Sequence, residues 1–84
     1  MAKFNFEIME RDGSLTESQG TFASFEEAKA EACRTLANVA ADGLPLPPMN
    51  MVSVQILDEV MKPLWEARLV LEEVDKAAVM SRSN

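Results

Sequence analysis

Histidine and tyrosine are absent from this 84-residue sequence, and cysteine occurs once, as Cys33. Histidine is the side chain that most readily exchanges a proton near neutral pH, so no Ser-His-Asp or Cys-His catalytic arrangement can form within the chain. A single cysteine supplies neither a disulfide framework nor, without histidine, the ligand set of a zinc site. Carboxylates remain, but no spacing singles out a catalytic pair. We therefore expect no enzymatic activity, no metal and no cofactor.

Basic residues are few: eight Lys and Arg stand against fourteen Asp and Glu, for a net charge of −6. Nucleic-acid binding needs a cationic surface that releases phosphate counterions, and an anionic membrane repels the same excess of acid. No apolar run reaches the length of about 18 residues that crosses a bilayer. The opening "MAKFNFEIME" lacks the apolar segment of a signal peptide. We expect no nucleic-acid or membrane partner and a cytoplasmic location.

The first third of the chain predicts a β-hairpin. Residues 3–10 alternate, with Phe4, Phe6 and Ile8 on one face, which is typical of a half-buried strand. The dipeptide Asp12-Gly13 follows, a strong hairpin-turn signal because glycine adopts positive φ without steric cost. Residues 15–22 are polar and predict a return strand at the edge of a sheet.

Residues 24–43 predict one helix. Ser24 and Glu27 have the spacing of a capping box, and Gly43 is the expected glycine after the helix, with Leu44 placed for the hydrophobic contact of a Schellman motif. Helical spacing aligns an apolar stripe composed of Phe25, Ala28, Ala32, Leu36 and Val39. Cys33 lies at the shoulder of this stripe, far from the helix N-terminus, and we interpret it as a small packing residue rather than a reactive thiol.

The second half predicts another hairpin and a tail. Residues 51–58 alternate, residues 59–62 turn, and residues 63–72 form a last strand that begins at a proline, as strands tolerate. Its more apolar face carries Trp65, Ala67, Leu69 and Leu71. Residues 74–84 predict a short helical or frayed tail.

These elements predict a single α+β domain over residues 1–73. The order is ββαββ, and a helix long enough to cross back over the strands gives a four-stranded antiparallel sheet in the order 2-1-3-4, with one helix packed on one face. The expected core contains Phe4, Phe6, Ile8, Phe25, Ala28, Ala32, Leu36, Val39, Val52, Val54, Ile56, Trp65, Leu69 and Leu71.

One helix leaves the other face of such a sheet uncovered, and that face is more apolar than solvent contact requires. The candidate interface residues on it are Asn5, Glu7, Met9, Gln55, Leu57, Leu64, Glu66, Arg68 and Val70. Three alternatives stay open: a contact with a second copy of the chain, coverage by the apolar residues of the tail, and plain exposure. The two edge strands offer a second route to a homodimer, by strand pairing.

The chain resembles a family of short, uncharacterised bacterial proteins, best known from rhizobia and other alphaproteobacteria and registered as a domain of unknown function. The resemblance covers residues 3–73 and depends on "FNF" at the start, Asp12-Gly13, "SFEEAKAEACRTL", "VQILDE" and "KPLWEARLVLE". It implies a small α+β fold and no activity. Val60 and Met61 stand where that family has an acidic residue and a glycine, so a tight second turn is not expected from the resemblance.

A second resemblance is to the N-terminal module of HicB-type antitoxins, carried by "SFEEAKAEAC" and "DGLPLPP". Such modules are acidic and bind a basic toxin, but this chain has a second hairpin where they continue into a DNA-binding segment. The sequence thus favours a non-enzymatic protein-interaction module that forms a homodimer. The alternatives are an antitoxin-like inhibitor of a basic protein and a small-molecule-binding accessory protein.

Overall fold

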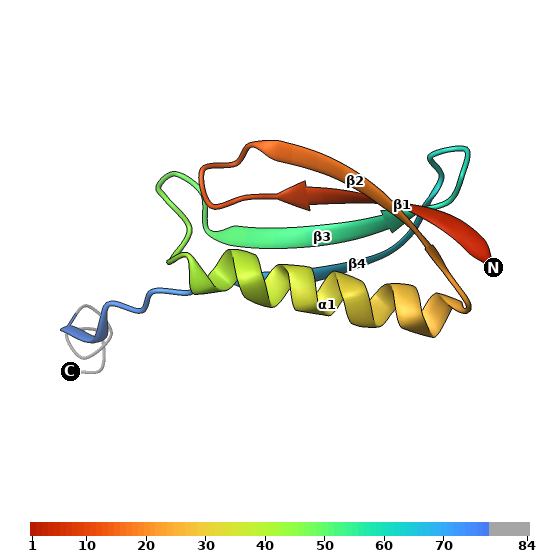
Figure 1. Ribbon diagram of the computed structural model, residues 1–84. Coiled ribbons are helices and arrows are strands. Elements are labelled where there is room, and N and C mark those ends of the chain that lie inside the picture. Colours follow the sequence, from red (N-terminus) through yellow and green to blue (C-terminus); the bar gives the residue numbers. More distant parts are fainter. Residues whose placement is uncertain (78–84) are drawn as a thin grey trace.

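The computed structural model describes residues 1–77 and contains one antiparallel sheet with one helix along it (Figure 1). The sheet order is β2-β1-β3-β4, which confirms the predicted ββαββ topology and the 2-1-3-4 order. The elements are β1 (Ala2–Met9), β2 (Leu15–Phe22), α1 (Phe25–Ala41), β3 (Met51–Leu57) and β4 (Pro63–Val70). Within residues 1–77 no helix is long and apolar enough to cross a membrane.

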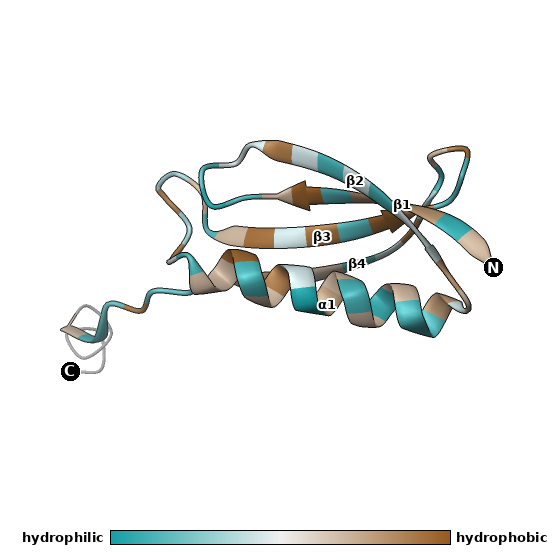
Figure 2. Ribbon diagram, viewed as in Figure 1, coloured by the Kyte–Doolittle hydropathy of each residue, from teal (hydrophilic) through white to brown (hydrophobic). Residues whose placement is uncertain are grey.

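The core lies between α1 and the two central strands. In register, Phe6 faces Ile56 and Ile8 faces Val54, so alternate residues of β1 and β3 make one apolar layer under the helix. Figure 2 shows the contrast between the largely apolar β3 and the more polar β2 at the edge. The buried cluster consists of Phe4, Phe6, Ile8, Ala28, Ala32, Leu36, Val39, Val52, Val54 and Ile56, all of them predicted core residues.

The ends of α1 are set by local hydrogen bonds. The Ser24 hydroxyl accepts a bond from the Glu27 N–H (3.2 Å), which confirms Ser24 as the N-terminal cap. The second bond of the predicted capping box is shifted by one residue, because the Glu27 carboxylate accepts the N–H of Ala23 (3.0 Å) rather than that of Ser24. At the other end Gly43 has φ +138°, and its N–H donates to Ala40 three residues back. This is one of the two bonds of a Schellman motif, and Leu44, which follows Gly43, is 66% exposed and lines a hollow together with Ala40.

The two hairpin turns share one geometry. In the first, the Glu10 N–H bonds the Ser14 carbonyl and the Gly13 N–H bonds the Glu10 carbonyl, both at 2.9 Å. The second turn repeats this pattern between Asp58 and Lys62, at 2.9 and 3.0 Å. The second turn is therefore tight despite its lack of glycine. The Asp58 carboxylate closes it by accepting the N–H groups of Val60 and Lys62, at 2.9 and 2.8 Å.

Three expected core residues, Phe25, Trp65 and Leu71, are only half-buried, and three other predictions of burial or exposure are wrong. Leu69 was expected in the core but is 47% exposed, because the part of α1 beside it ends in the small residues Ala40 and Gly43, which leave a hollow. Leu57 was expected on the exposed face but is buried, since it lies on a central strand between Asn5 and Pro63 and next to a bulge in the β3–β4 ladder. Cys33 was interpreted as a packing residue but is exposed.

The tail beyond β4 leaves the sheet past the C-terminal end of α1 (Figure 1). Val74 is 52% exposed, and residues 76 and 77 are helical. The described part of the tail thus does not cover the face of the sheet opposite α1. The rest of the predicted tail, residues 78–84, lies outside the described residues.

Candidate interaction surface

The face of the sheet turned away from α1, called the open face here, carries the nine predicted interface residues. The ladders place Asn5 beside Leu57, Glu7 beside Gln55, and Gln55 beside Glu66. Met9, Arg68 and Val70 follow from the same register pairs, whereas Leu64 lies at the bulge that shifts the β3–β4 ladder and is placed only by its position next to Trp65. The structure thus brings the predicted set onto one face, but its members differ in exposure.

The middle of the open face is polar. The register aligns Glu17, Glu7, Gln55 and Glu66 in one row across all four strands. Glu17 and Glu7 lie directly opposite each other, an arrangement of like charges that destabilises a strand pair. The neighbouring row contains Ser53, which is buried at 5% exposure. The middle of the open face is therefore an acidic row, and the exposed apolar Val70 lies toward its β4 edge.

The end of the open face near the second turn is closed by polar contacts. Asn5 donates its side-chain N–H to the Asp58 carbonyl (2.9 Å), which holds the β3–β4 turn against β1. Met61, from the same turn, lines a hollow of about 230 Å³ together with Asn5 and Gln19. Asn5 thus has a structural partner inside the chain, and Leu57 beside it is not accessible.

Exposed apolar side chains gather along β4, on both faces of the strand, and at the end of α1. We name the β4 apolar surface for five residues: Leu44, Pro45, Leu69, Val70 and Leu71. They line a hollow of about 210 Å³ together with Ala40, Gly43 and Val52. Leu44 is 66% and Val70 is 61% exposed. The sequence signal for this surface is "RLVL", which is apolar on both faces of the strand, next to the leucine that follows Gly43.

Charged side chains flank this surface on β4. The Glu66 carboxylate accepts a hydrogen bond from the Arg68 guanidinium at 2.9 Å, and this bond raises the pKa of Arg68. Both residues lie on the open face of a strand that pairs only with β3 in the described part of the chain. On the other side of β4, the Lys29 ammonium lies 5.9 Å from the centre of the Trp65 ring, which is half-buried.

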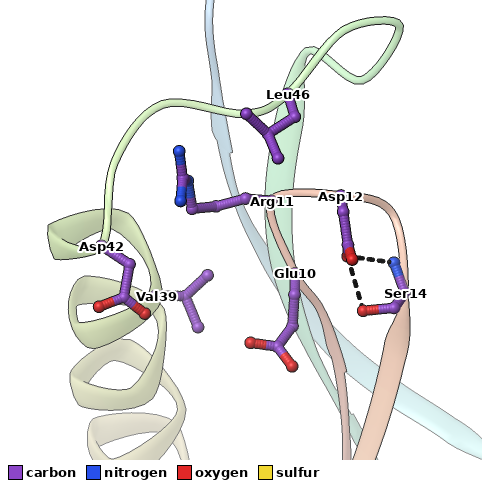
Figure 3. A pocket seen from close by; sticks show the side chains of 7 residues that line it. All are labelled: Glu10, Arg11, Asp12, Ser14, Val39, Asp42 and Leu46. Carbon is purple, nitrogen blue, oxygen red and sulfur yellow. Dashed lines mark hydrogen bonds between the residues drawn. The ribbon is translucent and has the colours of Figure 1, made fainter.

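A further hollow of about 230 Å³ lies between the first turn and the end of α1 (Figure 3). Arg11 crosses it, with its Nε donating to the Leu44 carbonyl (2.8 Å) while its own carbonyl accepts the Leu46 N–H (2.8 Å). Asp12 accepts two bonds from Ser14 at the rim. These contacts tie the first hairpin to the loop after α1, so the hollow is a structural junction.

Neither a metal site nor a related protein points to a function for this chain. In residues 1–77, no three or more acidic, cysteine or histidine side chains come together as metal ligands. Comparison of the chain with protein-family models, curated proteins and solved structures gives no match. The two resemblances stated from the sequence therefore stay predictions.

Proposed function

We propose that this chain is a non-enzymatic protein-interaction module that associates with a second copy of itself. The observation that carries the proposal is the β4 apolar surface, where Leu44, Leu69 and Val70 are each about half or more exposed. A small domain gains free energy by covering such a surface, at roughly 25 cal/mol per Å² of apolar area removed from water. A protein partner removes this apolar area from water.

The size of the hollows also supports a protein partner. Among residues 1–77, three hollows measure about 210 to 230 Å³, and another, beside the proline-rich loop, measures about 360 Å³. Pockets that enclose a small organic ligand usually begin at about 300 Å³ and bury most of the ligand. The hollow of the β4 apolar surface is smaller than this, and its aliphatic lining is better suited to another protein than to a small molecule.

Sedimentation equilibrium of the purified chain over a wide concentration range tests this proposal. We expect a species of twice the chain mass, with a dissociation constant that salt raises only modestly, because apolar contact contributes most and exposed ion pairs contribute little. Leu69→Ser and Val70→Ser should each weaken association, whereas Val60→Ser, in the exposed second turn, should not. A chain that remains monomeric at every concentration would refute the proposal.

A second candidate function is inhibition of a basic protein partner, and the acidic row on the open face favours it. Glu17, Glu7 and Glu66 lie in that row, in a chain of net charge −6. Complementary charge of this kind accelerates encounter with a cationic partner and makes binding salt-dependent. Titration with an oligolysine peptide tests it: Glu7→Lys should weaken binding more than Glu59→Lys, which makes the same charge change outside the row. If both variants weaken binding equally, net charge alone accounts for the binding and the acidic row is not the binding site.

A further inference from the structure

The backbone of β4 presents a regular set of outward-facing groups. The Leu71 N–H donates to the Asn50 carbonyl at 2.7 Å, so Leu71 points its backbone groups toward β3. Backbone direction alternates along a strand, and the ladder between Met51–Val70 and Ile56–Trp65 is regular. The N–H and C=O groups of Glu66, Arg68 and Val70 therefore face away from the sheet, where a further strand could pair with them.

The two edges of the sheet differ in their suitability for pairing. Natural edge strands are protected by proline, charge or bulges that prevent association with another strand. β4 has Pro63 and a bulge only at its beginning, and the stretch from Trp65 to Val70 is regular. β2, at the opposite edge, is polar and contains Gly20 in its interior. The structure thus leaves one regular and partly apolar edge.

We propose that two copies of this chain pair antiparallel through β4, with Ala67 facing the partner subunit's Ala67. The inference rests on the proposed self-association and assigns its surface and register. A two-fold axis perpendicular to the sheet relates the copies, which joins both sheets into one and places both helices on the same side. Glu66 and Arg68 then exchange backbone hydrogen bonds across the interface, because both have outward-facing groups.

Charge selects this register among its neighbours. With Ala67 on the axis, Glu66 lies opposite the partner subunit's Arg68, and Arg68 lies opposite the partner subunit's Glu66. A register centred on Glu66 or on Arg68 instead places two like charges face to face. Opposite charges stabilise a cross-strand pair and like charges destabilise it, so the register centred on Ala67 is favoured on both sides of the axis.

The apolar side chains of β4 fit the same register. On the helix side, Leu69 faces the partner subunit's Trp65, and the hollow beside Ala40 and Gly43 leaves room for the indole ring. At the end of the regular stretch, Val70 lies opposite the partner subunit's Leu64, which is next to the bulge. Leu64, Leu69 and Val70 are all exposed in the single chain, at 44%, 47% and 61%. Each therefore gains an apolar neighbour when two chains pair.

Complementary charge variants test the register. Glu66→Arg places two arginines opposite each other, and Arg68→Glu places two glutamates opposite each other, so each variant alone should dimerise about tenfold or more weakly. An equimolar mixture restores both opposite-charge pairs and should form a heterodimer, measured by native mass spectrometry. Glu17→Arg is the matched control on the other edge and should dimerise like the unmodified chain. A mixture that stays monomeric, or a control that also loses its dimer, overturns the proposed register.

Two further measurements use the unmodified chain and therefore do not depend on whether a variant folds. Amide hydrogen exchange at Glu66 and Arg68 should slow with rising concentration, while the outward-facing Glu17 and Gln19 amides of β2 stay fast. Emission of Trp65, the only tryptophan, should change over the same concentration range. A dimer without these changes overturns pairing through β4 but leaves self-association intact. A chain that is monomeric throughout refutes both proposals.

Discussion

Gly13 and Met61 occupy the same position in the two hairpin turns of this protein. Each is the fourth residue of a five-residue turn, each donates its N–H to the carbonyl three residues back, and each has positive φ, +87° and +66°. Glycine adopts this left-handed conformation freely, whereas for methionine it costs about 1–2 kcal/mol of conformational free energy. The second turn therefore forms although its sequence lacks the usual residue, and the bonds to the Asp58 carboxylate offset part of the strain.

We expect Met61→Gly to stabilise the protein relative to Met61→Ala. The relief of left-handed strain, about 1–2 kcal/mol, exceeds the entropic cost of glycine in the unfolded chain, about 0.5–1 kcal/mol. The net difference should be about 0.5–1 kcal/mol in the free energy of unfolding, measured by urea denaturation. Alanine is the matched reference because it removes the side chain but keeps the β-carbon. Equal stability of the two variants would contradict this account.

Gly43 and Arg11 should prove energetically coupled. A β-carbon on Gly43, at φ +138°, would lie 2.7 Å from the Arg11 Nη2 atom and would displace the guanidinium that bonds the Leu44 carbonyl. We expect Gly43→Ala to cost about 1–3 kcal/mol of stability from backbone strain and this clash. In an Arg11→Ala background the cost should fall by about 0.5–1 kcal/mol, because the clash is removed. Strictly additive effects in this double-mutant cycle would argue against the contact.

Asp12 should make the first turn sensitive to acid. Its carboxylate accepts bonds from the Ser14 hydroxyl (2.6 Å) and N–H (2.9 Å), and chiefly the hydroxyl bond lowers the pKa of Asp12 below its ordinary value. A lowered pKa contributes stability above the unfolded-state value and loses it as the pH falls through the folded-state value. NMR titration should place the Asp12 midpoint below the ordinary aspartate range, and Ser14→Ala should raise it. A midpoint unchanged by Ser14→Ala would refute this cause.

Cys33 should react in the folded protein. Its side chain is exposed on α1, so DTNB should modify it in native buffer at nearly the rate found in denaturant. Cys33→Ser should change the free energy of unfolding by less than about 0.5 kcal/mol, as at other surface sites. For the control, Ala32→Cys in the Cys33→Ser background places a thiol at a fully buried position, which should be protected. Protection of Cys33 to the same degree would restore the packing interpretation.

Local chemistry and periodicity predicted most of the fold. The alternation in residues 3–10 and 51–58, the Ser24–Glu27 cap and the Asp12-Gly13 turn each depend on neighbours within a few residues, and the structure contains all four. The strand order followed because a polar strand belongs at an edge and a helix crossing returns the chain beside the first strand. The alternation of side chains along each strand also predicted which face of the sheet carries the candidate site residues.

Exposure within that site depended on the tertiary structure. Leu57 and Leu69 are similar leucines in similar strands, yet one is buried and the other 47% exposed. The difference arises from what lies beside them: a central position and a bulge cover Leu57, while the hollow under the end of α1 uncovers Leu69. Periodicity assigns a residue to a face, but the neighbours that cover it come from distant parts of the chain. The sequence by itself therefore determined the elements, their order and the two faces. Only the tertiary packing, of α1 across β3 and β4 on one face and of neighbouring strands and the bulge on the other, decided which apolar side chains remain free to meet a partner.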